Sequence, residues 1–214
     1  MNNQFRQTSA FMLFMGAFLA AATMIHHPIG GSIEYIIHVK KVIMFTHALA
    51  IACMPFIGFG AWGLSVHLQT PGRLSMLGFC VFSIGLMGGI IAAAFNGFVM
   101  PNFVEHYYGT KASRETLDMI VHYGFDINAA MAYLFIGGTT FAVGVWSVVI
   151  LATSRLPKWI GYYGLLILAA GLAGLLLKFN FISVWGFSIF VFGLISWLVL
   201  AGVLMWRRKS DLVN

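Results

Sequence analysis

Charged residues are scarce in this chain of 214 residues, because only 8% are Asp, Glu, Lys or Arg. A soluble domain usually carries about 25%. Hydrophobic residues make up 60% of the chain, and 24 positions are glycine. This composition excludes a disordered chain and a soluble enzyme, and it is typical of a membrane protein. The net charge of +6 comes from scattered Lys and Arg without a basic patch, so we expect no nucleic-acid partner.

Cysteine is nearly absent as well. Cys53 and Cys80 both lie in apolar stretches, where they are typical of small buried hydrophobic residues. No CxxC motif is present, which argues against thiolate metal sites and dithiol redox chemistry. The sequence also lacks a phosphate-binding loop, a nucleophile elbow and an HExxH motif, so it indicates no catalytic residue.

Long uncharged runs are what the chain has in abundance. A helix needs about 20 apolar residues to cross a membrane, and six runs reach or approach that length. The sequence therefore predicts an all-α, polytopic integral membrane protein, with residues 1–214 in a single six-helix transmembrane domain. The expected helices cover roughly residues 8–27, 40–66, 74–100, 124–153, 159–178 and 182–206.

The Lys and Arg residues of the short loops predict an orientation, because cytoplasmic loops carry an excess of them. With the N-terminus inside, seven fall on the inner side and five on the outer side. We therefore expect a multi-pass protein of a bacterial-type cell inner membrane with both termini in the cytoplasm. The inner residues are Arg6, Arg73, Arg155, Lys158, Arg207, Arg208 and Lys209, and the outer ones are Lys40, Lys41, Lys111, Arg114 and Lys178.

An internal repeat relates two of the expected helical hairpins. Residues 33–38 (IEYIIH) match residues 117–122 (LDMIVH) at a spacing of 84 (117 − 33), which also separates Trp62 from Trp146. Helices one and two, and helices three and four, are therefore interpreted as a tandem helical-hairpin repeat. Helices five and six are a candidate third copy.

Two carboxylate–histidine pairs lie in the repeated segments. Glu34 and His38 are four residues apart, as are Asp118 and His122, so each pair shares one helix face. Hairpins packed about an axis along the membrane normal place equivalent residues at equal depth, so the pairs are expected to face each other near the outer surface. Such side chains suit Zn, Fe, Mn or Cu(II). The candidate metal ligands are Glu34, His38, Asp118, His122 and Asp126.

Solvated helix ends with an ordinary Lys41–Asp126 ion pair are the alternative interpretation of these residues. His47 lies nine residues after His38, on the opposite helix face and about 13 Å along the axis, so the two cannot share one ion. Ionisable groups within a span are candidates for function, and His47 is expected to serve a different site. This site would use His47 alone or together with His26 or His27 at the end of the first helix. The alternative is that His47 is a neutral histidine in the core, hydrogen-bonded to Thr or to a backbone carbonyl. The candidate cofactor-binding residues are His27 and His47.

Three functions are compatible with this pattern. The leading hypothesis is an outward-facing site that binds a transition metal (Zn, Fe or Cu) or haem for redox or hydrolytic chemistry on a membrane-soluble substrate. The alternatives are a transporter of a small solute or ion, and a non-catalytic subunit that scaffolds a membrane complex. The expected partners are membrane lipid and a membrane-soluble small molecule, and the sequence is also compatible with an oligomer.

Overall fold

The structure is a computed structural model that describes residues 2–28, 31–69, 72–110 and 114–207. Lys111, Arg208 and Lys209, which enter the charge count above, lie outside these residues. The described part of the chain is helical without a strand, and it contains six segments long and apolar enough to cross a membrane. The predicted all-α, six-span membrane fold is therefore confirmed.

The described residues contain eight α-helices and one π-helical turn, and seven of the α-helices together with this turn build the six spans. The third span is continuous from Leu74 to Tyr107 and contains the π-helical turn η1. The short helix α2 lies outside the spans. The elements are α1 (Asn3–Ile25), α2 (Ile33–His38), α3 (Lys40–His67), α4 (Leu74–Ala94), η1 (Phe95–Val99), α5 (Met100–Tyr107), α6 (Arg114–Thr153), α7 (Lys158–Leu176) and α8 (Val184–Arg207).

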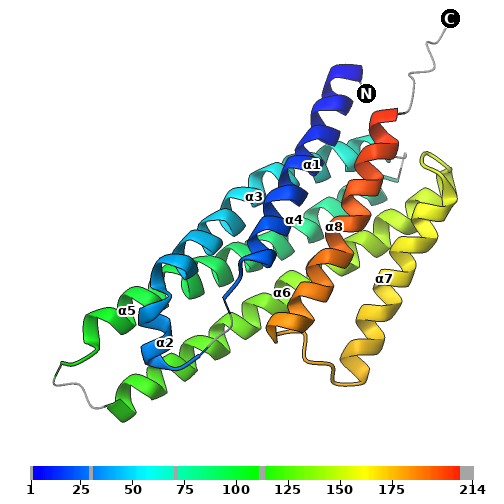
Figure 1. The fold of residues 1–214 in the computed structure, drawn as a ribbon. Coiled ribbons are helices and arrows are strands. Elements are labelled where there is room, and N and C mark those ends of the chain that lie inside the picture. Colours follow the sequence, from blue (N-terminus) through cyan, green and yellow to red (C-terminus); the bar gives the residue numbers. More distant parts are fainter. Residues whose placement is uncertain (1, 29–30, 70–71, 111–113, 208–214) are drawn as a thin grey trace, which may run out of the picture.

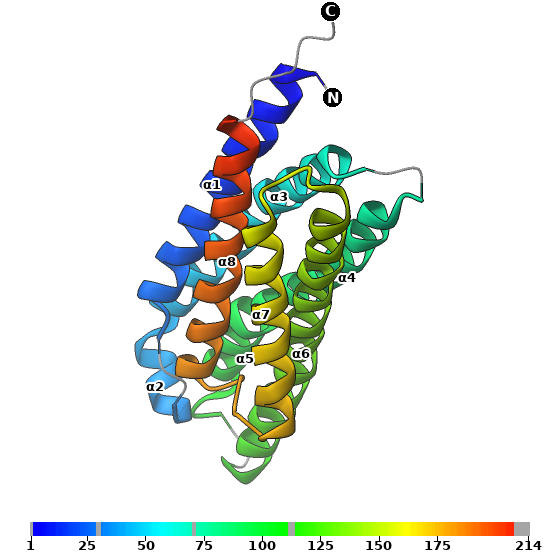
Figure 2. The same cartoon turned by 90° about the vertical axis from the view of Figure 1, so that its right-hand side faces the viewer.

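The helices form a bundle in which α1 packs against both α3 and α8, and α4 packs along α6 (Figures 1 and 2). α7 packs on α6 at one side of the bundle. The start of α1 and the end of α8 lie at the same end of the molecule (Figure 1). At the opposite end, α2, α5 and the start of α6 extend past the α7–α8 connection (Figure 1). This extension carries most of the polar residues singled out in the sequence.

Three helices of the bundle are preceded by a turn in which a single residue has a recognisable role. Arg73 precedes α4 in the left-handed conformation, with φ 52°, and Pro157 stands at the N-cap of α7. Between α7 and α8, the side chain of Asn180 accepts hydrogen bonds from the backbone N–H groups of Ile182 and Ser183. These local bonds form the turn that leads into α8, as turn-forming residues do.

Two helix starts differ from the expectation. α6 begins at Arg114, ten residues before the expected position 124, because its first turns are polar and lie outside the apolar run that marks a span. Residues 33–38 form the separate helix α2, because the chain leaves helical geometry at Val39 (φ −101°, ψ 13°). The matching residues 117–122 instead lie inside the continuous helix α6. The two segments of the repeat are therefore built differently.

The tryptophans paired by the repeat also differ in their surroundings. Trp146 is fully buried, whereas Trp62 is 40% exposed. The indole N–H of Trp146 donates to Ser65 Oγ (2.9 Å) and to the carbonyl of Ser75 (3.0 Å), which ties α6 to α3 and α4. Trp62 instead packs edge-on against the ring of Phe5. The structure does not confirm the hairpin repeat.

Glycines allow the closest helix contacts inside the bundle. A Cβ at Gly138 of α6 would come 2.8 Å from the Cα of Gly85 on α4, which is closer than real Cβ atoms approach. A Cβ at Gly89 would come 2.9 Å from the ring of Phe135. The GxxxG pattern formed by Gly85 and Gly89 therefore serves packing within the molecule.

Candidate ligand cavity

A cavity of about 300 Å³ lies within the bundle and is lined by residues of α1, α3, α4, α6 and α8. One end is polar and carries the side chains of His27, His47, Asn96 and Asn128. The remainder is apolar and includes Ile57, Phe82, Leu86, Leu194 and Ile195. A concave, mostly apolar space with a few polar groups at one place is the usual form of a small-molecule site.

The cavity is elongated along the helices. On α3 its lining runs from His47 to Ile57, and on the third span it runs from Asn96 to Phe82. At 1.5 Å per residue, these stretches correspond to roughly 15 and 21 Å along the helix axes. The polar groups therefore lie toward the end of the bundle that carries α2 and α5, and the apolar part reaches deep into the spans.

His47 is held in place by its own helix. The side chain is buried, and its ring Nδ1 lies 2.8 Å from the carbonyl oxygen of Ile43, one turn earlier in α3. Because a carbonyl only accepts, Nδ1 carries a proton, and burial without a counter-charge favours the neutral ring, in which Nε2 keeps a free lone pair. The neutral histidine bonded to a backbone carbonyl, which the sequence left open, is therefore present, but it lies at a cavity.

The π-helical turn η1 makes room for this imidazole. A Cβ at Gly97 would come within 2.6 Å of His47 Cγ, and closer still to its Cβ, so only glycine fits at this position. The neighbouring residue Asn96 lines the cavity. Single π-helical turns inside α-helices occur frequently at functional sites. The Asn96–Gly97 dipeptide in an otherwise apolar span is the sequence signal for this feature.

His27 follows the end of α1 and approaches His47. Its ring Nδ1 lies 2.9 Å from the carbonyl oxygen of Pro28, so the same reasoning leaves Nε2 unprotonated. The two ring centroids are 5.0 Å apart, with 56° between the ring planes. Burial lowers the pKa of His27 below its ordinary value of 6.5, and the bond to Pro28 partly opposes this shift. His27 is therefore neutral near pH 7, and together with His47 it is here called the histidine pair.

The histidine beside this pair has a different position. His26 is exposed, and its Nδ1 lies 2.9 Å from the carbonyl oxygen of Ala22 within α1. It does not line the cavity. Of the two adjacent histidines in the sequence, the structure therefore brings His27 to His47.

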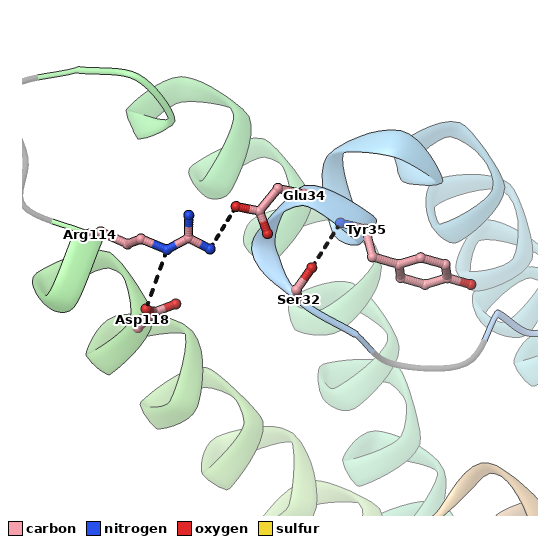
Figure 3. A network of polar contacts seen from close by, with 5 residues as sticks. All are labelled: Ser32, Glu34, Tyr35, Arg114 and Asp118. Atoms are coloured by element: carbon pink, nitrogen blue, oxygen red, sulfur yellow. Dashed lines mark hydrogen bonds and ion pairs between the residues drawn. The ribbon is translucent and has the colours of Figure 1, made fainter.

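Arg114 lies between two of the predicted metal ligands (Figure 3). Its Nη2 is 2.7 Å from Glu34 Oε1, and its Nε is 4.0 Å from Asp118 Oδ2. The pKa of Glu34 is lowered by the backbone N–H at the start of α2, by the hydroxyl of Ser32 and by Arg114. Glu34 and Asp118 do approach each other, but a guanidinium occupies the space between them and links α2 to α6.

The other predicted ligands point outward. His38, His122 and Asp126 are exposed, while the neighbouring Leu117 and Val121 form the face of α6 that packs against α2, α3 and α5. Among the described residues, no group of three or more His, Cys, Asp or Glu side chains is placed to hold a metal ion. A metal site formed by Glu34, His38, Asp118, His122 and Asp126, here called the outer cluster, therefore stays a prediction.

The ion pairs at this end also differ from the expected one. Lys40 at the start of α3 bonds to Glu105 of α5. Lys41 and Asp126 are both exposed, and the described part of the chain contains no ion pair between them. The Lys40–Glu105 and Glu34–Arg114 pairs hold α2, α3, α5 and α6 together above the polar end of the cavity.

Comparison of the chain with protein-family models, curated proteins and solved structures finds no match in any of the three. The fold and the cavity therefore define the class to which the chain is assigned. It is a multi-pass helical membrane protein whose bundle contains an elongated cavity with a polar, histidine-containing end.

Proposed function

We propose that the protein binds an uncharged, membrane-soluble molecule with an apolar tail in the cavity. The observation that carries this proposal is the shape and lining of the cavity, which has polar groups at one end, is apolar beyond them and extends roughly 15–21 Å along the helices in all. The tail would lie between α1, α3, α4, α6 and α8, and the polar group of the molecule would meet the histidine pair.

The chemistry of the polar end selects the kind of headgroup. Both imidazoles present Nε2 as a hydrogen-bond acceptor, so they favour a group that donates, such as a hydroxyl. The side-chain amides of Asn96 and Asn128 make no hydrogen bond within the described residues, so they are available as donors or acceptors. No Lys, Arg, Asp or Glu lines the cavity in the described part of the chain. A charged headgroup would lack a counter-charge, which is costly in a buried site.

This proposal retains the membrane-soluble molecule expected from the sequence and places its polar contacts at His27 and His47. A ligand of this kind supports a substrate- or cofactor-dependent role over a purely scaffolding one. With both termini in the cytoplasm of a cell inner membrane, as the Lys and Arg bias indicates, the polar end would lie toward the outer side.

Equilibrium binding of three probes with equal chain length tests the proposal. We expect a long-chain alcohol to bind purified protein in lipid nanodiscs more tightly than the matching carboxylate or ammonium compound. Ala132→Phe fills the cavity and should abolish binding, whereas Ala130→Phe, on an exposed position of the same helix, should not. Equal binding of all three probes, or equal binding by both variants, would contradict the proposal.

A further inference from the structure

We infer that His27 and His47 together bind one transition-metal ion, and that Cu(I) is the ion they favour. The inference goes beyond the organic ligand and does not rest on it. The ion takes the two Nε2 lone pairs, so the ion and a hydroxyl bonded to both imidazoles are alternative occupants of the polar end of the cavity. It concerns His27, which follows the end of α1, and His47 of α3, which meet at the polar end of the cavity.

The hydrogen bonds of both rings are those of metal-binding histidines. Such a histidine ligates through one ring nitrogen and donates its other N–H to a carbonyl or carboxylate, which fixes the tautomer. Here both Nδ1 atoms face backbone carbonyls, of Pro28 and Ile43, at 2.9 and 2.8 Å. Both Nε2 atoms are consequently unprotonated, and neither makes a hydrogen bond in the described part of the chain.

The separation of the rings fits a single ion with three or four ligands. With metal–nitrogen bonds of about 2.0–2.1 Å, the centroids of two imidazoles lie about 5 Å apart at tetrahedral angles and about 6 Å apart when they are opposite each other. The observed centroid distance is 5.0 Å. This spacing favours adjacent ligands on one ion and disfavours a haem clamped between two axial histidines.

The remaining groups around the pair favour a singly charged, soft ion. No third His, Cys, Asp or Glu joins the pair among the described residues, so the three protein ligands typical of catalytic zinc are missing. The absence of a carboxylate from the described lining disfavours a divalent ion, whose charge would stay uncompensated. Met24, in the last turn of α1 and three residues before His27, lines the same cavity, and thioethers select Cu(I).

Metal loading of four purified proteins tests the inference. Wild type and the His27→Ala, His47→Ala and His38→Ala/His122→Ala variants are titrated with Cu(I) against a chelator of known affinity, and with Zn(II) in parallel. We expect wild type to bind one Cu(I) with imidazole ligands visible in the X-ray absorption spectrum. Each single cavity variant should lose at least ten-fold in affinity, while the double variant in the outer cluster should retain it.

Each remaining outcome counts against the inference. No stoichiometric Cu(I) binding by wild type would overturn it, as would unchanged binding in both cavity variants. Loss of binding only in the His38→Ala/His122→Ala protein would assign the metal to the outer cluster, and binding of Zn(II) alone would overturn the choice of ion. His26→Ala controls for the loss of a histidine next to the site, and thermal unfolding of every variant identifies any misfolded protein.

Discussion

Gly97 lies directly against the side chain of His47, and the absence of a Cβ at Gly97 is what admits the imidazole between α3 and the π-helical turn. The two residues are 50 positions apart in the sequence (97 − 47) and belong to different spans. Their contact sets the position of the histidine pair at the polar end of the cavity. The contact is therefore the most specific structural link between the packing of the bundle and the proposed ligand site.

Replacement of this glycine should damage the site. We expect Gly97→Ala to displace His47, to destabilise the protein by about 1–3 kcal/mol through overpacking, and to weaken alcohol binding by roughly ten-fold. Gly137→Ala is the matched control, because a Cβ there meets no other atom within 4 Å and alanine is the better helix former. Thermal unfolding and equilibrium binding measure both effects, and identical behaviour of the two variants would contradict the assigned contact.

The sequence predicts the spans well because apolar length alone defines them. Each of the six expected helices begins or ends within a few residues of the observed span, while α6 starts early at Arg114 in a polar stretch and the third span continues to Tyr107. The sequence left open whether His47 acts alone, with one of the adjacent histidines or as a core residue. Helix periodicity shows which residues share a face of one helix, but it does not show which other helix packs against that face. The link from Arg114 to Glu34 depends on the break in helical geometry at Val39, which separates α2 from α3 and which no local pattern specifies.

Trp146 should contribute more to stability than Trp62, although the repeat aligns them. Trp146→Phe removes the donor to Ser65 and to the carbonyl of Ser75, and we expect a loss of about 1–3 kcal/mol because a buried acceptor is left unpaired. Trp62→Phe should cost less, since that side chain is 40% exposed and donates no such bond. Thermal unfolding in detergent compares the two, and equal losses would restore the equivalence expected from the repeat.

The ion pair between Glu34 and Arg114, which attaches α2 to α6, should weaken only at acidic pH. The folded state lowers the pKa of Glu34 from its ordinary value of 4.5. The stabilisation of the α2–α6 contact by the ionised Glu34 is therefore complete above about pH 4.5, and it is lost as the pH falls through the lowered pKa. Spin labels at the exposed positions Tyr35 and Met119 report the distance between the helices. We expect an unchanged distance distribution from pH 7 to pH 5 and a broader one in stronger acid.

The matched variant for this experiment is Glu34→Gln, which removes the titrating group. Its distance distribution should be broader at neutral pH and should not change further on acidification. If it showed the same acid transition as the wild-type protein, another group would control the contact.

The orientation of the bundle can be tested by labelling single cysteines in intact cells. In a background with Cys53 and Cys80 replaced by serine, an impermeant maleimide should react at Thr110→Cys. It should reach Asn3→Cys and Gly72→Cys only after lysis, because the Lys and Arg bias places their end of the bundle in the cytoplasm. The reverse pattern would invert the topology and would place the polar end of the cavity toward the cytoplasm.

Photolabelling tests most directly the claim that the cavity holds the tail of a membrane-soluble molecule. The probe is a long-chain alcohol with a diazirine at the end of its tail, bound to the protein in lipid nanodiscs and mapped by mass spectrometry. We predict labels at the deep lining residues Phe82, Leu194 and Ile195, which excess unlabelled alcohol and the Ala132→Phe substitution suppress and Ala130→Phe does not. Labels confined to the exposed residues Leu172 and Leu176, or labels that excess alcohol leaves unchanged, would contradict the account.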